Sequence, residues 1–149
     1  RITQTVYRGS WDFLLNGRGD IWEAAWEIFQ KYPIVGGGVD SFRDALECHL
    51  NLLENAVKYT PKGGSIYISV MEQEVFGKIS IRDTGRGIPA EHQAQIFQRF
   101  YREPEVHDED GIGIGLYLAR KIVTMQDGYM EVHSESGKGA EFCIYLPMK

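Results

Sequence analysis

A glycine-rich turn between two regular elements constrains the fold of this chain more than any other stretch. It runs from Asp83 to Pro89 and reads Asp-Thr-Gly-Arg-Gly-Ile-Pro. The alternating residues 78–82 before it predict a strand, and the run from Glu91 to Phe97 after it predicts a helix. A carboxylate at a strand end thus stands beside glycines that let the backbone turn tightly and approach a ligand closely. Alone, so short a pattern is more typical of a structural turn or a helix cap, so its meaning depends on the surrounding segments.

Upstream of this turn, the residues from Asp40 to Tyr59 predict a helix with an unusual polar face. Its apolar residues recur every three or four positions, whereas Asn51, Asn55 and Lys58 share the other side. These three residues alone would fit a solvated surface, but asparagine prefers caps and turns to helix interiors, so two in mid-helix need a further reason. Amide oxygens suit Mg²⁺, and a lysine ammonium suits a phosphate.

Downstream, a second glycine turn opens the last predicted helix. Gly111, Gly113 and Gly115 directly precede the helical pattern of residues 116–124. The N–H groups and positive dipole end at such a helix start favour phosphate groups. The spacing matches neither a Walker A loop nor a dinucleotide fingerprint. The acidic residues 103–110 before it lack periodicity, which predicts a mobile loop over the site.

The remaining patterns predict a sheet. Residues 65–71, 129–135 and 141–146 alternate between apolar and polar side chains, as strands with one buried face do. The β-prone residues 1–8 predict an edge strand. We therefore expect an α/β two-layer sandwich in which helices cover one face of a mixed, mostly antiparallel sheet.

Four blocks in this order resemble the N, G1, G2 and G3 boxes of the ATP-binding domain of sensor histidine kinases. The blocks are residues 51–60, 83–89, 111–116 and 137–142, and the resemblance covers about residues 40–149. That domain has the Bergerat fold and belongs to the superfamily of DNA gyrase, Hsp90 and MutL. The resemblance implies an enzyme that binds ATP and Mg²⁺ and donates the γ-phosphate to a histidine on a separate dimerisation domain.

The resemblance also implies a role for each matching residue. Asp83 would accept a hydrogen bond from the exocyclic amine of adenine, and Asn55 would bind Mg²⁺ with Asn51 assisting. Asn55, Lys58 and Arg102 would act in catalysis. The implied nucleotide-binding residues are Asn51, Asn55, Lys58, Tyr59, Asp83, Gly85, Gly87, Ile88, Tyr101, Gly111, Gly113, Gly115 and Leu116.

Two positions distinguish this chain within the superfamily. Members that hydrolyse ATP carry a glutamate base where Asn51 stands, and an amide cannot take up a proton usefully at neutral pH. Glu54 lies beside Asn55 in sequence but about 100° round the helix from it. The sequence therefore favours transfer of the phosphate over hydrolysis. Ala140 stands where the family commonly has a threonine that helps to hold a polar group near adenine, so a weakened affinity is expected.

Residues 96–102 resemble the family's F box, in which we expect Phe97 and Phe100 to pack in the core under the lid. The four histidines do not resemble the family's phosphoacceptor box, so we expect ATP binding without autophosphorylation by this chain alone. These histidines are His49, His92, His107 and His133. The implied partners are the dimerisation and phosphoacceptor helices and a response regulator.

Composition bounds the remaining possibilities. The formal net charge of -5 argues against nucleic acid as the main partner. Neither a transmembrane run nor a signal peptide is visible, and the chain begins at Arg1, so we expect the cytoplasmic portion of a membrane-anchored sensor, without membrane contact of its own. Cys48 and Cys143 lack metal-ligand spacing, which predicts buried, reduced thiols.

The segment of residues 1–39 fits the resemblance worst, and we treat it as an atypical segment packed on the domain of residues 40–149. Residues 20–31 predict a helix with an aromatic stripe, and the pattern from Asn16 to Phe42 is similar to a loop of O-antigen ligases and polymerases. Two alternatives therefore stay open. One is an inactive or rearranged nucleotide-binding module, and the other is an ATP-gated ATPase of the gyrase or Hsp90 kind.

Overall fold

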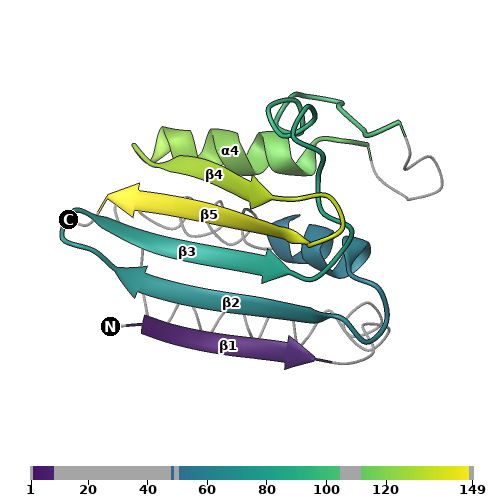
Figure 1. Ribbon diagram of the computed structural model, residues 1–149. Helices are drawn as coiled ribbons and strands as arrows, with labels where there is room; N and C mark the ends of the chain where they lie inside the picture. The colour runs from purple at the N-terminus through teal and green to yellow at the C-terminus, as the bar shows by residue number, and fades with distance from the viewer. Residues whose placement is uncertain (1, 9–47, 49–50, 105–111, 148–149) are drawn as a thin grey trace.

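The fold is built on one antiparallel sheet. The computed structural model describes residues 2–8, 48, 51–104 and 112–147. The strands follow the order β1-β2-β3-β5-β4, and their four pairings are all antiparallel (Figure 1). The elements are β1 (Ile2–Arg8), β2 (Ser65–Glu72), β3 (Phe76–Asp83), β4 (Tyr129–Ser134) and β5 (Ala140–Pro147).

Two helical segments form the second layer. Helix α4 (Gly115–Met125) and the helix of residues 51–59 lie on the same side of the sheet (Figure 1). This arrangement confirms the predicted α/β sandwich, and the predicted edge strand is also confirmed as β1. Among the described residues, no helix is both long and apolar enough to cross a membrane.

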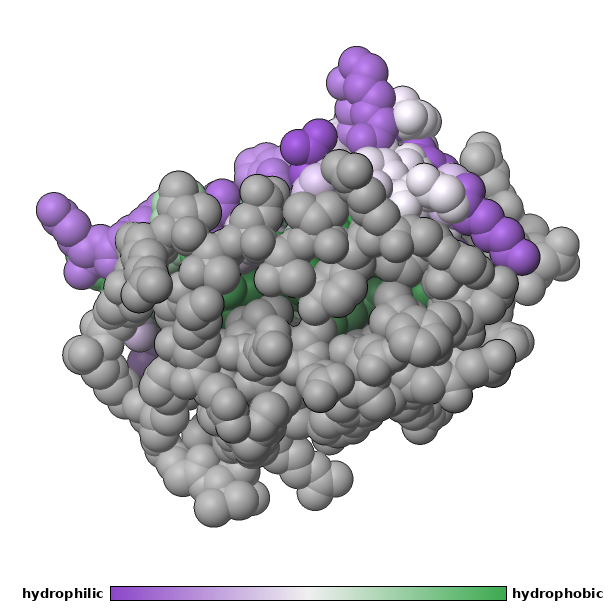
Figure 2. All heavy atoms as spheres, turned by 90° about the horizontal axis from the view of Figure 1, so that it is seen from below, coloured by the Kyte–Doolittle hydropathy of each residue, from purple (hydrophilic) through white to green (hydrophobic). Residues whose placement is uncertain are grey.

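The core lies between these two layers because the apolar faces of both point inwards. Phe97 packs edge-on against Phe142, with the ring centroids 6.4 Å apart. In the view of Figure 2, described side chains at the periphery are hydrophilic, whereas hydrophobic ones are visible towards the middle. The largest fully buried side chains are Cys48, Leu52, Ile66, Ile79, Ile81, Val123, Cys143 and Ile144. Both cysteines are thus free and buried, as predicted.

The segment after the first glycine turn differs from the prediction. Residues 90–97 form consecutive turns and not a regular helix. The backbone N–H of His92 donates to Pro89 and that of Gln95 to His92, which are three-residue spacings, and only Ile96 makes a four-residue bond. Gln93 is drawn out of a helical pattern because its side-chain amide donates to the carbonyl oxygens of Ile88 and Ser134.

Phe100 is the second difference. We expected it in the core beside Phe97, but its side chain is 58% exposed and its φ is 64°. This left-handed conformation lets its N–H donate to the carbonyl oxygen of Gly113, at 2.9 Å, and turns the ring outwards. The bond ties the residues before the predicted lid to those that follow it.

Several predictions fall outside the described residues. They concern the helix of residues 20–31, the helix start near Asp40, the lid of residues 105–110 and Gly111. The boundary between residues 39 and 40 stays a prediction for the same reason.

Candidate functional site

A cavity of about 360 Å³ opens between the helix of residues 51–59, the end of β3 and the start of α4. Most of the residues that the sequence singled out for nucleotide binding line it. They are Asn51, Asn55, Lys58, Tyr59, Asp83, Gly87, Ile88, Tyr101, Arg102, Gly113, Gly115 and Leu116. Gly85 does not line the cavity, and Gly111 lies outside the part of the chain that the structure describes.

Asp83 provides the acceptor at one end of the cavity. Its side chain is only 5% exposed, and burial raises the pKa of its carboxyl, although two backbone hydrogen bonds lower it. Oδ1 accepts both of these bonds, from Gly85 N–H at 2.8 Å and from Ala140 N–H at 3.3 Å. Oδ2 is therefore the oxygen that a ligand in the cavity can reach.

Gly85 and Gly87 are also needed by the fold itself, and of the two only Gly87 lines the cavity. A Cβ at Gly85 would lie 2.3 Å from the carbonyl oxygen of Tyr59. A Cβ at Gly87 would lie 2.1 Å from that of Glu135, and its φ is +71°. Both glycines are thus required because backbone packs on backbone there, and this packing fixes where Asp83 ends β3.

The polar face of the helix of residues 51–59 forms the cavity wall opposite α4. The side-chain oxygen of Asn51 lies against Gly115, since a Cβ on that glycine would stand 3.6 Å from it. The Tyr59 ring is flanked by two cations. Lys58 Nζ lies 5.5 Å and Arg86 Cζ 5.2 Å from its centroid. The charge of Arg86 is compensated by Glu103, so Lys58 is the cation of this pair that favours an anionic ligand.

The start of α4 is open to a ligand. Ile114 occupies the N-cap position without a side-chain cap hydrogen bond, and the first turn holds no acidic residue. The first N–H groups of an α-helix have no partner within the helix, and the dipole makes this end positive. Gly113, Gly115 and Leu116 all line the cavity, so these donors meet it. The predicted anion-binding geometry is present in the described part of this turn.

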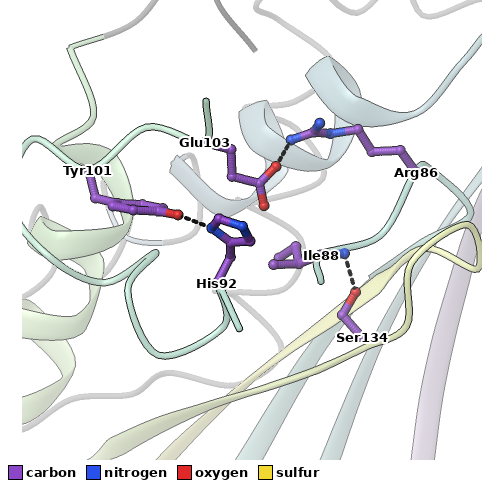
Figure 3. A network of polar contacts seen from close by, with 6 residues as sticks. All are labelled: Arg86, Ile88, His92, Tyr101, Glu103 and Ser134. Atoms are coloured by element: carbon purple, nitrogen blue, oxygen red, sulfur yellow. Dashed lines mark hydrogen bonds and ion pairs between the residues drawn. The ribbon is translucent and has the colours of Figure 1, made fainter. Parts of the chain in front are cut away.

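Sequence reasoning missed two charged residues in the cavity wall, Arg86 and Glu103. Arg86 Nη2 forms an ion pair with Glu103 Oε2, which joins the first glycine turn to the residues before the predicted lid (Figure 3). The Glu103 side chain is 11% exposed and that of Arg86 is 38% exposed. The two residues are 17 positions apart and follow no shared periodicity, so only the folded chain reveals the pair.

Tyr101 is held by a second contact in the same network. Its hydroxyl is hydrogen-bonded to His92 Nδ1 (Figure 3). Burial, followed by the nearby carboxylates of Glu103 and Glu91, raises the pKa of the Tyr101 phenol. The phenol therefore stays neutral at ordinary pH.

Glu54 also borders the cavity, together with the apolar side chains of Ile96, Ile112, Ile114 and Phe142. The helical angle of about 100° from Asn55 had placed this carboxylate away from the site. It is exposed in the structure, so it reaches the cavity from its solvent side. A carboxylate is consequently available near the asparagines even though residue 51 is not one.

The donor set limits which metal ion could be held here. Among the described residues, no group of three or more His, Cys, Asp or Glu could hold a metal ion. Asn51 and Asn55 contribute neutral amide oxygens to the cavity wall. Mg²⁺ fits such a sparse set, because it usually takes one or two protein oxygens and completes its shell with phosphate oxygens and waters.

Comparisons with known proteins agree with this geometry. The adaptive-response sensory kinase SasA of Thermosynechococcus vestitus (strain NIES-2133 / IAM M-273 / BP-1) is 43% identical over 119 residues, which cover 78% of this chain and 30% of that protein. The chain thus spans about a third of this relative's length.

Two solved structures are also similar. The mycobacterial sensor histidine kinase MprB has a TM-score of 0.69 at 21% identity, covering 96% of this chain and 97% of that one, which shows the fold. Full-length ShkA in complex with AMPPNP has a TM-score of 0.62 at 30% identity, covering 70% of this chain and 21% of that one. Residues 43–149 match the family described as histidine kinase-, DNA gyrase B-, and HSP90-like ATPase, and the chain belongs to that family.

Proposed function

We propose that this chain is the catalytic, ATP-binding domain of a two-component sensor histidine kinase. The observation that carries the proposal is one cavity with a buried acceptor, Asp83, at the end of β3 and the uncapped start of α4 in another wall. A purine with an exocyclic amine suits the first group, and a polyphosphate suits the second. Family membership and the ShkA complex with AMPPNP support the same ligand.

Each end of the cavity has its own task. Asp83 accepts the hydrogen bond of the adenine amine, whereas a guanine carbonyl there would face the carboxylate as a second acceptor. Such unpaired buried polar groups cost about 1–3 kcal/mol each, which is enough to select the base. Lys58, Arg102 and the N–H groups of α4 bind the phosphates. Asn55, assisted by Asn51, would hold Mg²⁺, which neutralises charge on the phosphate oxygens when it is bound.

The phosphoryl group passes to a histidine that this domain does not supply. A ring nitrogen of that histidine forms a bond to the γ-phosphorus while the bond to the β,γ-bridging oxygen breaks and ADP leaves. Lys58 and Arg102 stabilise the charge that develops on the leaving phosphate. The acceptor lies on dimerisation helices of the parent protein, which then passes the group to a response regulator.

The test supplies those helices separately. The chain is incubated with γ-labelled ATP, Mg²⁺ and a separately produced dimerisation and phosphoacceptor hairpin of a sensor histidine kinase. We expect label on the hairpin, no label on the chain alone, and loss of transfer in Asn55→Ala. A hairpin without its phosphoacceptor histidine is the control. Label that appears on the chain itself, or a folded chain that does not bind ATP, would overturn the proposal.

ATP hydrolysis is the second candidate, and the position of Glu54 at the cavity is the observation that favours it. The amide at residue 51 argues against it, since it cannot act as the base that activates water. Steady-state release of inorganic phosphate from ATP by the chain alone decides between the two. We expect no appreciable turnover. Turnover that disappears in Glu54→Gln would identify this carboxylate as the base and the chain as an ATPase.

A further inference from the structure

The carboxylate of Glu103 has one oxygen without a partner. Oε1 is buried, and within the described chain it is the only buried side-chain oxygen or nitrogen without a hydrogen bond. Its other oxygen, Oε2, is taken by Arg86. An ionised carboxylate accepts hydrogen bonds at both oxygens, and a buried acceptor without a donor is costly. Since Glu103 lines the cavity, a ligand can supply the missing donor.

The direction of that oxygen is fixed by its neighbours. The guanidinium of Arg86 lies over the Tyr59 ring and holds Oε2, so the carboxylate cannot rotate freely. Figure 3 shows Glu103 between Arg86 and His92, with its second oxygen on the side of Ile88. The ion pair also neutralises the glutamate, so that it does not repel an anionic nucleotide. Glu103 Oε1 is therefore an acceptor whose direction is fixed and whose charge is compensated by Arg86.

The chemistry of ATP limits which of its groups could donate to Oε1. Phosphate oxygens are acceptors at neutral pH, and one N–H of the adenine amine is taken by Asp83. Apart from the second N–H of that same amine, the two ribose hydroxyls are the remaining donors of the nucleotide itself. Arg86 follows Asp83 by three residues and contacts Tyr59, whose carbonyl oxygen packs against Gly85. Arg86 thus links Glu103, on the lid side, to residues next to the base end, and Glu103 is separate from the asparagines that face α4.

We propose that Glu103 is a sugar-recognising residue, whose Oε1 accepts a hydrogen bond from a ribose hydroxyl of the bound nucleotide. This inference rests on the proposed function, because it concerns the same cavity. It makes the residue after Arg102 a determinant of specificity, and it assigns Arg86 the task of positioning that carboxylate. The ligand class is a ribonucleoside triphosphate in preference to its deoxy forms.

The test compares three nucleotides on each protein by calorimetry with Mg²⁺. They are ATP, 2′-deoxy-ATP and 3′-deoxy-ATP. For the unchanged chain we expect at least one deoxy form to bind about tenfold more weakly than ATP, as loss of a hydrogen bond to a charged acceptor predicts. In Glu103→Leu we expect that ratio to fall to about one. Glu74→Leu, at an exposed position between β2 and β3, is the matched control and should keep the ratio.

The ratio is measured within each protein, so a change in the folded fraction does not alter it. Arg86→Leu is a second variant at a more exposed position, and it should lower the ratio by releasing the carboxylate. Equal binding of all three nucleotides by the unchanged chain would overturn the inference while leaving ATP binding intact. A ratio retained in Glu103→Leu would assign the sugar to another residue. Absence of any ATP binding would instead overturn the proposed function.

Discussion

The two sides of the cavity are built on different principles. At the base end, hydrogen bonds join the end of β3 to the turn after it and to the start of β5, since Asp83 Oδ1 accepts one backbone N–H from each. A Cβ at Gly139 would lie 2.0 Å from the carbonyl oxygen of Asp83, so the two segments are in direct backbone contact. On the lid side, α4 begins without a side-chain cap, and Glu103 keeps a buried oxygen without a partner.

This difference separates a preformed surface from an incomplete one. The base end is closed by the chain's own hydrogen bonds, so it keeps its geometry without a ligand. The lid side holds an acceptor without a partner and a helix start without a side-chain cap, and we expect a bound ligand to complete their hydrogen bonds. Substitutions at the base end should therefore alter which base is chosen, whereas those on the lid side should alter how the phosphates and the sugar are held.

The largest effect is expected from Asp83→Asn. The two backbone N–H groups require an acceptor at the Oδ1 position, so the amide oxygen stays there and the NH₂ group takes the place of Oδ2. That donor then faces the donor amine of adenine. ATP affinity should fall about a hundredfold, because two buried donors are left unpaired. Calorimetry with ATP and GTP measures it, and the preference for ATP over GTP should fall as well.

Ser80→Ala offers a control for this variant, since Ser80 is buried on β3 but does not line the cavity. It should leave both nucleotide affinities unchanged. Retention of ATP affinity in Asp83→Asn would break the assignment of this end to the base.

A smaller loss is expected from Asn55→Ala on the opposite wall. If the amide oxygen holds Mg²⁺, the variant should bind ATP in the presence of Mg²⁺ about tenfold more weakly than the unchanged chain does. Its affinity should then equal that of the unchanged chain in EDTA. Titrations with and without Mg²⁺ measure this difference. A variant that keeps the full Mg²⁺ dependence would place the ion on other residues.

The buried charge of Asp83 should also be visible in stability. Because burial raises the pKa of this carboxyl above its ordinary 3.8, the native state binds the proton more tightly than the unfolded chain does. The free energy of unfolding then decreases as pH rises from 3.8 through the raised pKa. Urea unfolding across this range should show Asp83→Asn gaining stability relative to the unchanged chain. A constant difference would contradict a raised pKa.

The same contrast explains what could be predicted from the sequence. The strands and α4 follow local alternation and periodicity, and Asp83 is recognisable because it ends a strand beside glycines. The Arg86–Glu103 pair joins residues 17 positions apart, so no local pattern marks it. Phe100 resembles a core residue in sequence, but the bond from its N–H to Gly113 turns it outwards. Residues 90–97 have a helical pattern in the sequence, but the side chain of Gln93 forms hydrogen bonds with other segments, which no local pattern predicts.

The smallest effect is expected from Ala140→Thr at the base end. Ala140 is 6% exposed and lines the cavity, so a hydroxyl added there meets the ligand. One neutral hydrogen bond contributes about 0.5–1.5 kcal/mol, which predicts an ATP affinity a few times higher. Ser136→Thr in the exposed turn is the control. An unchanged or lower affinity would show that the threonine of related chains does not act through the nucleotide.

The most direct test of the nucleotide cavity is a titration of the ¹⁵N-labelled chain with Mg²⁺ and AMPPNP, followed through the backbone amide signals. The two-sided site predicts saturable shifts at both ends at the same ligand concentration, for Gly85 and Ala140 beside Asp83 and for Gly115 and Leu116 at the start of α4. Saturation that moves signals elsewhere, or a folded chain whose signals do not move, would contradict the assignment of this cavity to a nucleotide.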